Sequence, residues 1–148
     1  PGVCGSYYGN PEETAKQFRD GWFHSGDLFK RDEDGFYYFS GRASRLIKVA
    51  GLKVYPTELE DVISKHPEVA EVAVVRAVSQ RHGEVPRAVV VTVEGSQITA
   101  EELRRYCAGL LEHFKVPRIF EFREALPKNP VGKILYRVLE ENQGESGL

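Results

Sequence analysis

Hydrophobic and polar residues follow two different periods along this chain, and the changes of period divide it into short elements. Apolar positions three or four residues apart, together with capping residues, predict helices at residues 11–18, 56–66, 99–111 and 134–142. Runs rich in valine, isoleucine and aromatic residues, bounded by turn-forming residues, predict strands at residues 22–30, 36–39, 46–49, 52–55, 69–78, 87–93 and 119–122. The order after Gly41 predicts an α+β fold in which helices pack on a small sheet.

Local signals support several of these elements. Asn10 followed by proline and acidic residues is a helix start, and Thr99 with Glu102 three residues on forms a capping box. Residues 87–93 are almost continuously apolar and β-branched, which predicts a central strand. The aromatic residues at 36–39 are expected to lie in the core.

The pattern also predicts how the chain is organised. Residues 1–40 offer one helix and one hairpin, too few elements to bury a core of their own, so we expect them to be the end of a larger domain. Residues 41–45 break the pattern, and residues 46–148 form the α+β domain. The sequence contains no methionine, even at position 1, so we expect a chain cut from a longer protein.

Composition narrows the class of protein. The 148 residues are 41% hydrophobic and 28% charged, which is typical of globular domains. The formal net charge of −2 lacks the overall basic character that is typical of nucleic-acid-binding proteins. The longest apolar run, residues 88–93, is far shorter than the about 20 residues that a transmembrane helix needs. Two distant cysteines and no secretory signal predict a cytoplasmic protein, and the four histidines show no metal-ligand spacing.

Three segments carry candidate chemistry. His24-Ser25-Gly26-Asp27 places a carboxylate at a strand start, where it can accept hydrogen bonds from two neighbouring sugar hydroxyls. Residues 41–56 combine basic side chains with a turn at Gly51, which suits phosphate groups. Residues 127–134 contain two prolines and a glycine, which fix a loop that presents Lys133 just before a helix.

Each segment also has an ordinary explanation when taken alone: a turn aspartate, a solvated charged hairpin and a surface lysine. For Asp27 and for the charged hairpin, the local pattern favours that explanation. The Gly-Lys pair at 132–133 is not a Walker A loop, because Pro127 stands where that loop requires glycine.

Taken together and in order, the segments resemble the end of an adenylate-forming enzyme, the superfamily of acyl-CoA synthetases, carrier-protein adenylation domains and beetle luciferase. The stretch from Asp20 to Asp27 is similar to the family's D-G-W-x-x-T-G-D motif, with Ser25 where threonine is usual. Residues 41–60 resemble its hinge and following hairpin, and residues 127–134 resemble the loop of its catalytic lysine. The resemblance covers essentially the whole chain and reverses the preference for the ordinary explanations of Asp27 and Lys133.

The resemblance implies an architecture. Residues 1–40 would be the end of a large N-terminal adenylation domain, and residues 41–45 would be the hinge. Residues 46–148 would be a small mobile C-terminal domain, a three-stranded sheet flanked by helices plus a short two-stranded hairpin.

The resemblance also implies a role for individual residues. Lys133 would be catalytic in adenylation, Asp27 would bind the ATP ribose, and Arg42 would support the nucleotide. Ser44 would be the hinge residue, although the family usually carries Asp or Lys there. Lys48 and Gly51 would frame the channel of the thiol acceptor, and no residue of the chain is assigned to a metal.

The implied function is that of an acyl- or aryl-CoA synthetase, which activates a fatty or aryl carboxylic acid with ATP and transfers it to CoA. Mg²⁺ would be held mainly by the large domain, which is the chain's expected partner, and the chain alone is expected to be inactive. Two alternatives stay open: an adenylation domain that loads a carrier protein, and a stand-alone docking module for an adenylating subunit. The segment from Leu46 to Gly51 favours the CoA-ligase version.

Overall fold

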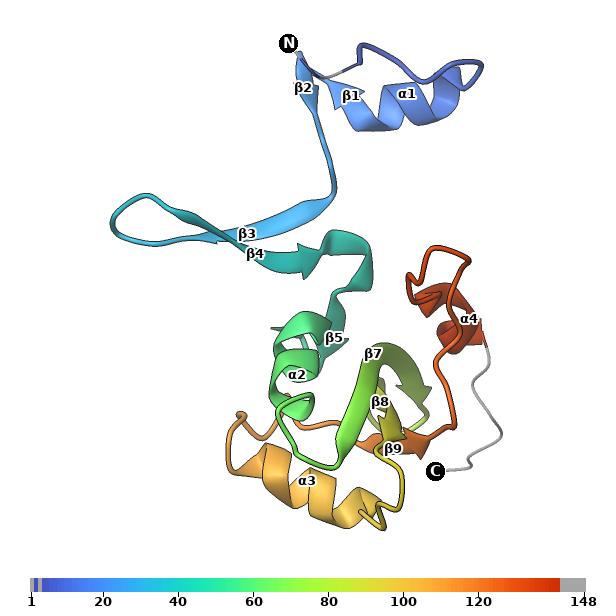
Figure 1. The fold of residues 1–148 in the computed structure, drawn as a ribbon. Coiled ribbons are helices and arrows are strands. Elements are labelled where there is room, and N and C mark those ends of the chain that lie inside the picture. The colour runs from blue at the N-terminus through green and yellow to red at the C-terminus, as the bar shows by residue number, and fades with distance from the viewer. Residues whose placement is uncertain (1, 3, 142–148) are drawn as a thin grey trace. The chain divides into compact units, whose positions relative to one another are not determined.

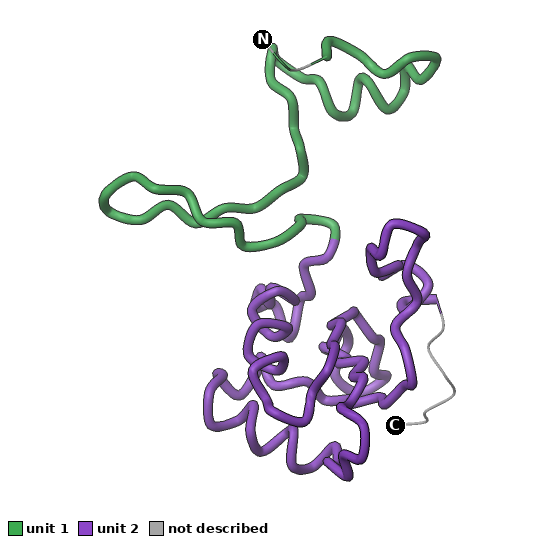
Figure 2. The backbone as a smooth tube through the Cα atoms, in the orientation of Figure 1, with its two compact units in different colours: residues 1–44 green, residues 45–148 purple. Residues whose placement is uncertain are grey.

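The computed structural model describes residue 2 and residues 4–141, and the chain divides into two compact units between Ser44 and Arg45 (Figure 2). The first unit contains α1 (Pro11–Gln17), β1 (Phe18–Arg19), β2 (Trp22–Phe23), β3 (Asp27–Arg31) and β4 (Tyr37–Arg42). The second unit contains β5 (Ile47–Val49), β6 (Leu52–Val54), α2 (Pro56–Ile63), β7 (Val69–Ser79), β8 (Gly83–Thr92), α3 (Ala100–Ala108), β9 (Ile119–Phe122) and α4 (Tyr136–Glu141) (Figure 1). A 3₁₀ turn, η1 (Ala43–Arg45), spans the division.

The first unit consists of one short helix and two separate two-stranded sheets, β1–β2 and β3–β4. The helix begins as predicted, because the Asn10 side chain accepts a hydrogen bond from the Glu13 amide at 3.0 Å. The β1–β2 hairpin was not predicted, although its turn residues Asp20 and Gly21 both have the positive φ that a two-residue hairpin turn requires.

The aromatic residues of the β3–β4 hairpin are exposed, so the prediction that they lie in a core was wrong. Each of the four is more than half exposed: Phe36, Tyr37, Tyr38 and Phe39. A two-stranded sheet buries a face only where a second layer covers it, and neither buried cluster of the structure contains a residue of the first unit.

The second unit confirms the predicted α+β class. Its main sheet has the order β7-β8-β9, with β8 antiparallel to β7 and parallel to β9, and β5 and β6 form a separate hairpin. The central position of β8 agrees with the nearly continuous β-branched run at residues 87–93.

The main sheet is buried on both faces. Val74, Ala88 and Val90 point into one cluster, which also receives residues of the β5–β6 hairpin, α2 and α3. Ala73 and Val89 point into the opposite cluster, which also receives residues of α4 and the loop before it. Because successive strand residues face opposite sides, the two clusters are separated by the sheet itself.

A buried arginine fixes α4 to the sheet. Arg87 of β8 is only 3% exposed, and its guanidinium pairs with the Glu121 carboxylate of β9 at 3.3 Å. The same guanidinium donates a hydrogen bond to the backbone carbonyl of Leu139 in α4. The charge is therefore paired and the helix carbonyl satisfied, as burial demands.

Helix boundaries differ modestly from the predicted ones. Helix α4 begins at Tyr136 rather than residue 134, because Ile134 bridges to Lys128 and Leu135 donates its amide to the Pro127 carbonyl at 2.8 Å. The predicted end of α4 at residue 142 lies outside the described residues. Within residues 2 and 4–141, no helix has the length and apolar character to span a bilayer.

The turn of the β5–β6 hairpin generates a stability prediction. Ala50 has φ +48° and Gly51 has φ +85°, so an alanine occupies the left-handed region that glycine tolerates best. We expect Ala50→Gly to raise the free energy of unfolding by about 0.5–1 kcal/mol. We expect Ala50→Val to lower it, because a β-branched residue is strained there. Urea denaturation of both variants gives the two signs, and equal midpoints would contradict the argument.

Candidate functional site

Asp27 and Arg42 lie opposite each other at the open end of the β3–β4 hairpin. They are register partners, and Asp27 Oδ1 lies 2.7 Å from Arg42 Nε. Arg42 Nη1 also donates to the Ser25 carbonyl at 3.0 Å, and the Ala43 amide donates to the Gly26 carbonyl at 2.8 Å. The hairpin therefore holds the carboxylate and the guanidinium together, and the nucleotide roles of both residues stay predictions.

The Asp27 carboxylate is partly buried beside Arg42. Oδ1 is buried yet accepts no well-directed hydrogen bond from the described residues, since the close Arg42 Nε is paired by charge and distance alone. The Asp27 side chain is 22% exposed. A ligand hydroxyl can therefore meet this carboxylate only through its exposed part, because Oδ1 itself is buried.

Ser44 lies in η1, is exposed, and is the last residue of the first unit. The division of the chain therefore falls inside residues 41–45. Whether this segment bends stays a prediction.

Lys48 and Gly51 lie on the β5–β6 hairpin. Lys48 is exposed and faces Lys53 across the strand pair, and its backbone amide donates to Glu84 Oε2 at 2.9 Å. Two like charges directly opposite each other repel, so an anion near this hairpin is favoured. Gly51 is exposed at the turn, with open space around its Cα.

The loop before α4 fixes the backbone of Lys133. Asn129 Oδ1 accepts hydrogen bonds from the amides of Val131 at 3.2 Å and Lys133 at 2.8 Å. The backbone amide of Asn129 in turn donates to the Lys133 carbonyl at 2.9 Å. Asn129 is a residue that sequence reasoning missed, although asparagine beside proline is a known turn signal.

The two lysines of this loop differ in their contacts. Lys128 Nζ lies 2.7 Å from the Glu71 carboxylate, so its charge is already paired within the protein. The exposed Lys133 side chain forms no ion pair or hydrogen bond with the described residues. A hydrogen-bonded loop that carries an ammonium group unpaired among the described residues suits a ligand with concentrated negative charge.

The structure brings together only some of the predicted residues. Asp27 and Arg42 are in contact, and both belong to the first unit. Lys48 and Lys133 belong to the second unit, and their loops pack on opposite faces of the main sheet. One ligand atom cannot meet both lysines while the sheet stands between them.

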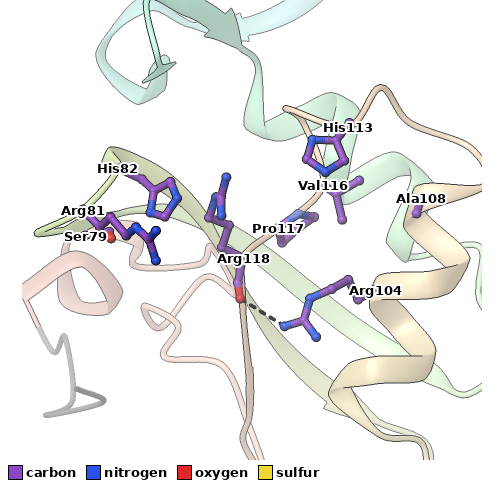
Figure 3. Close-up of a pocket in the computed structure, with 9 residues that line it drawn as sticks. All are labelled: Ser79, Arg81, His82, Arg104, Ala108, His113, Val116, Pro117 and Arg118. Atoms are coloured by element: carbon purple, nitrogen blue, oxygen red, sulfur yellow. Dashed lines mark hydrogen bonds between the residues drawn. The ribbon is translucent and has the colours of Figure 1, made fainter. Parts of the chain in front are cut away.

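Sequence reasoning missed a basic pocket in the second unit (Figure 3). It has a volume of about 440 Å³ and is lined by the end of β7, the β7–β8 turn, α3 and the segment before β9. Five of its lining residues are basic or histidine and none of those described is acidic: Arg81, His82, Arg104, His113 and Arg118. Ser79 and three apolar residues complete the lining: Ala108, Val116 and Pro117.

The pocket arginines are not equally free. Arg104 donates to the Glu101 carboxylate at 2.8 Å and to the Arg118 carbonyl at 3.1 Å, which is the dashed bond in Figure 3. Arg81 and Arg118 are exposed, and their side chains form no ion pair with the described part of the chain. No group of three or more potential ligand residues able to hold a metal ion occurs among residues 2 and 4–141.

Comparisons with known proteins agree on one family. The family model described as AMP-binding enzyme C-terminal domain matches residues 58–133. The chain is 39% identical over 146 residues to a long-chain-fatty-acid–CoA ligase of Bacillus subtilis, covering 99% of this chain and 26% of that protein. It is 43% identical over 135 residues to the fatty acid–acyl-carrier-protein ligase ScoC of Streptomyces coeruleorubidus, covering 91% and 26%.

Solved structures give the same result. ATP-bound MatB from Rhodopseudomonas palustris matches with a TM-score of 0.85 at 37% identity, over 92% of this chain and 27% of that one. The chain spans about a quarter of the length of the relatives that it matches.

The geometry of the Lys133 loop generates a second prediction. Asn129→Ala removes the acceptor of two amides, so we expect the Lys133 amide to exchange with solvent about tenfold faster, equivalent to about 1.4 kcal/mol. Asn129→Asp keeps an acceptor oxygen and is the matched control. Hydrogen exchange measured by NMR compares the two, and equal protection in the alanine variant would mean that the prolines alone fix the loop.

Proposed function

The chain belongs to the family of AMP-binding enzyme C-terminal domains, and from that premise we propose that it works within a ligase that joins a carboxylic acid to CoA. In the first step the acid's carboxylate attacks the α-phosphorus of ATP, and pyrophosphate leaves. In the second step the CoA thiolate attacks the acyl carbonyl of the adenylate, and AMP leaves. The observation that carries the proposal is Lys133, an exposed ammonium group that has no partner among residues 2 and 4–141 and stands on a hydrogen-bonded loop.

The proposed domain organisation follows the resemblance. Residues 1–40 end a large adenylation domain, residues 41–45 form the hinge with Ser44 as its pivot, and residues 46–148 form the mobile small domain. The lengths of the relatives support this organisation, since the chain corresponds to about a quarter of each. The large domain supplies the acid pocket and the triphosphate site. The large domain would also hold most of the Mg²⁺ site.

Lys133 acts on the first step. Negative charge builds on the oxygens around the α-phosphorus as the carboxylate attacks. A positive group that is already in place lowers the energy of that charge without reorganising during the reaction. The two hydrogen bonds to Asn129 hold the backbone of this segment in advance.

Asp27 and Arg42 act on the nucleotide. The Asp27 carboxylate accepts hydrogen bonds from the ribose hydroxyls, and Arg42 orients that carboxylate and adds positive potential beside the phosphates. Their contact across the hairpin supports a shared role.

The second step uses the opposite face of the small domain. The β5–β6 hairpin, with Lys48 and Gly51, frames the path of the thiol. The basic pocket lined by Arg81 and Arg118 suits the phosphates at the other end of CoA, because these two guanidinium groups form no ion pair with the described residues and each presents planar pairs of donors. Rotation about the hinge exchanges the two faces between the steps.

A second candidate has the same first step and a carrier protein as the acceptor. Its support is the 43% identity to the acyl-carrier-protein ligase ScoC. The basic pocket favours CoA, since the nucleotide end of CoA is a compact polyanion. We propose the cytoplasm as the location, where ATP and CoA are both present.

The proposed role of Lys133 predicts a separation of the two steps. In the ligase that carries this chain, we expect Lys133→Ala to reduce acid-dependent ATP–pyrophosphate exchange by about 10²–10³-fold, the size found for removing one preorganised charge-stabilising group. Thioester formation from supplied acyl-adenylate should stay within threefold. Lys128→Ala is the control, because Lys128 is already paired with Glu71. An equal loss in both steps would sink the assignment.

The basic pocket predicts which acceptor is used. We expect Arg81→Ala and Arg118→Ala each to raise the KM for CoA about tenfold or more, since a charge-assisted hydrogen bond contributes about 1.5–3 kcal/mol. The KM for phosphopantetheine, which lacks the nucleotide, should not change. Arg105→Ala removes a charge from the exposed side of α3 and is the control. An unchanged KM for CoA with weaker loading of a carrier protein would favour the second candidate.

A further inference from the structure

Arg45, the first residue of the second unit, has a side chain that joins three elements of that unit. Its Nη2 lies 2.5 Å from Glu60 Oε1 in α2 and donates to the Val74 carbonyl in β7 at 3.2 Å. Its Cζ lies 3.5 Å from the ring centroid of Tyr136 in α4. One guanidinium therefore contacts both layers that flank the strand.

Glu60 contacts both Arg45 and the backbone of β7. Its Oε1 also accepts a hydrogen bond from the Val74 amide at 2.8 Å, so the carboxylate holds the strand backbone and the guanidinium together. The side chains of Arg45 and Glu60 are only 20% and 14% exposed. A pair this far out of water is screened less than a surface ion pair, so breaking it costs more.

Tyr136 links this cluster to the lysine loop. It is the first residue of α4, three positions after Lys133, and it packs against the cluster that contains Val89 and Leu139. Burial and the Glu60 carboxylate raise the pKa of the Tyr136 hydroxyl above its usual value. The ring is therefore held between the core and a charged pair, and it stays neutral.

We propose that Arg45 is a positioning residue, which holds the start of α4 and hence the Lys133 loop at a fixed place relative to the hinge. The catalytic role of Lys133 in this proposal rests on the proposed function. Because the Arg45 side chain is built into the second unit, the rigid body begins at Arg45, and the bending falls on residues up to Ser44. The contacts of Arg45 therefore mark the end of the hinge, and through Tyr136 they also determine the position of the Lys133 loop.

The size of the effect follows from geometry. A cation over a tyrosine ring contributes most when both groups are partly removed from water. A displacement of about 1 Å at a catalytic group costs up to about 10²-fold in rate. We therefore expect loss of the Arg45–Tyr136 contact to slow adenylation about 10- to 100-fold.

A first experiment tests the contact without any enzyme assay. Arg45→Met and Tyr136→Leu are made in the chain, and hydrogen exchange is measured at the amides of Lys133 and Leu135. The proposal expects exchange at least fivefold faster in both variants and little change in Tyr136→Phe, which keeps a ring. Arg31→Met and Tyr37→Leu, which take apart an exposed arginine–tyrosine contact in the β3–β4 hairpin, are the controls. Unchanged exchange in the test variants would overturn the proposal.

A second experiment tests the catalytic consequence in the ligase that carries this chain. The expected result is slower pyrophosphate exchange in Arg45→Met and Tyr136→Leu, with thioester formation from supplied acyl-adenylate within threefold and recovery in Tyr136→Phe. An equal fall in both steps would reduce Arg45 to a purely structural residue and overturn the proposal.

Two further outcomes can be told apart. If Tyr136→Leu does not fold, Arg45→Lys takes its place in both experiments with the same expected result. Lysine keeps the charge but loses the planar guanidinium that contacts Glu60, Val74 and the Tyr136 ring together. A wild-type ligase without pyrophosphate exchange would refute the proposed function, while the amide-exchange experiment would still decide the role of Arg45.

Discussion

The second unit depends on the pairing of β7 with β8, because these two long strands supply side chains to both of its buried clusters. Neither α4 nor the β5–β6 hairpin has enough apolar surface to fold by itself, and each is ordered by the face that it covers. Backbone hydrogen bonds inside the sheet satisfy polar groups that would otherwise be buried without partners. Arg87 adds a buried polar link between the sheet and α4, to the carbonyl of Leu139.

The sequence was sufficient to predict most elements, since hydrophobic period and capping residues are local signals. The capping box of Thr99 and Glu102 is present in the structure, and strand β9 (Ile119–Phe122) has the predicted bounds. The exposed aromatic residues of β3–β4 were predicted wrongly, because side-chain type favours burial without saying whether a second layer covers that face. Burial is a property of the assembled layers, whereas strand formation is largely a property of the segment.

The candidate site shows the same difference between local signals, which the sequence carries, and groupings that arise from tertiary packing. Lys133 could be singled out because two prolines and a glycine surround it, and Asp27 because a known motif contains it. The basic pocket and the Arg45 cluster could not, since each joins residues that are distant in sequence. Arg81 and Arg118 come from different loops, and Arg45 meets Tyr136 only after α4 has docked on the sheet. Such groupings are created by tertiary packing and leave no spacing that a sequence pattern can detect.

The alternation of side chains along β8 has a consequence for how such a domain can evolve. Ala88 and Val90 support the hairpin face, whereas Val89 between them supports the lysine face. Conservative substitutions at even and odd positions therefore change the packing of two different faces of the domain. A single-residue insertion in this strand would exchange the two sets at once. Selection should thus tolerate changes of side chain in β8 far more readily than changes of its length.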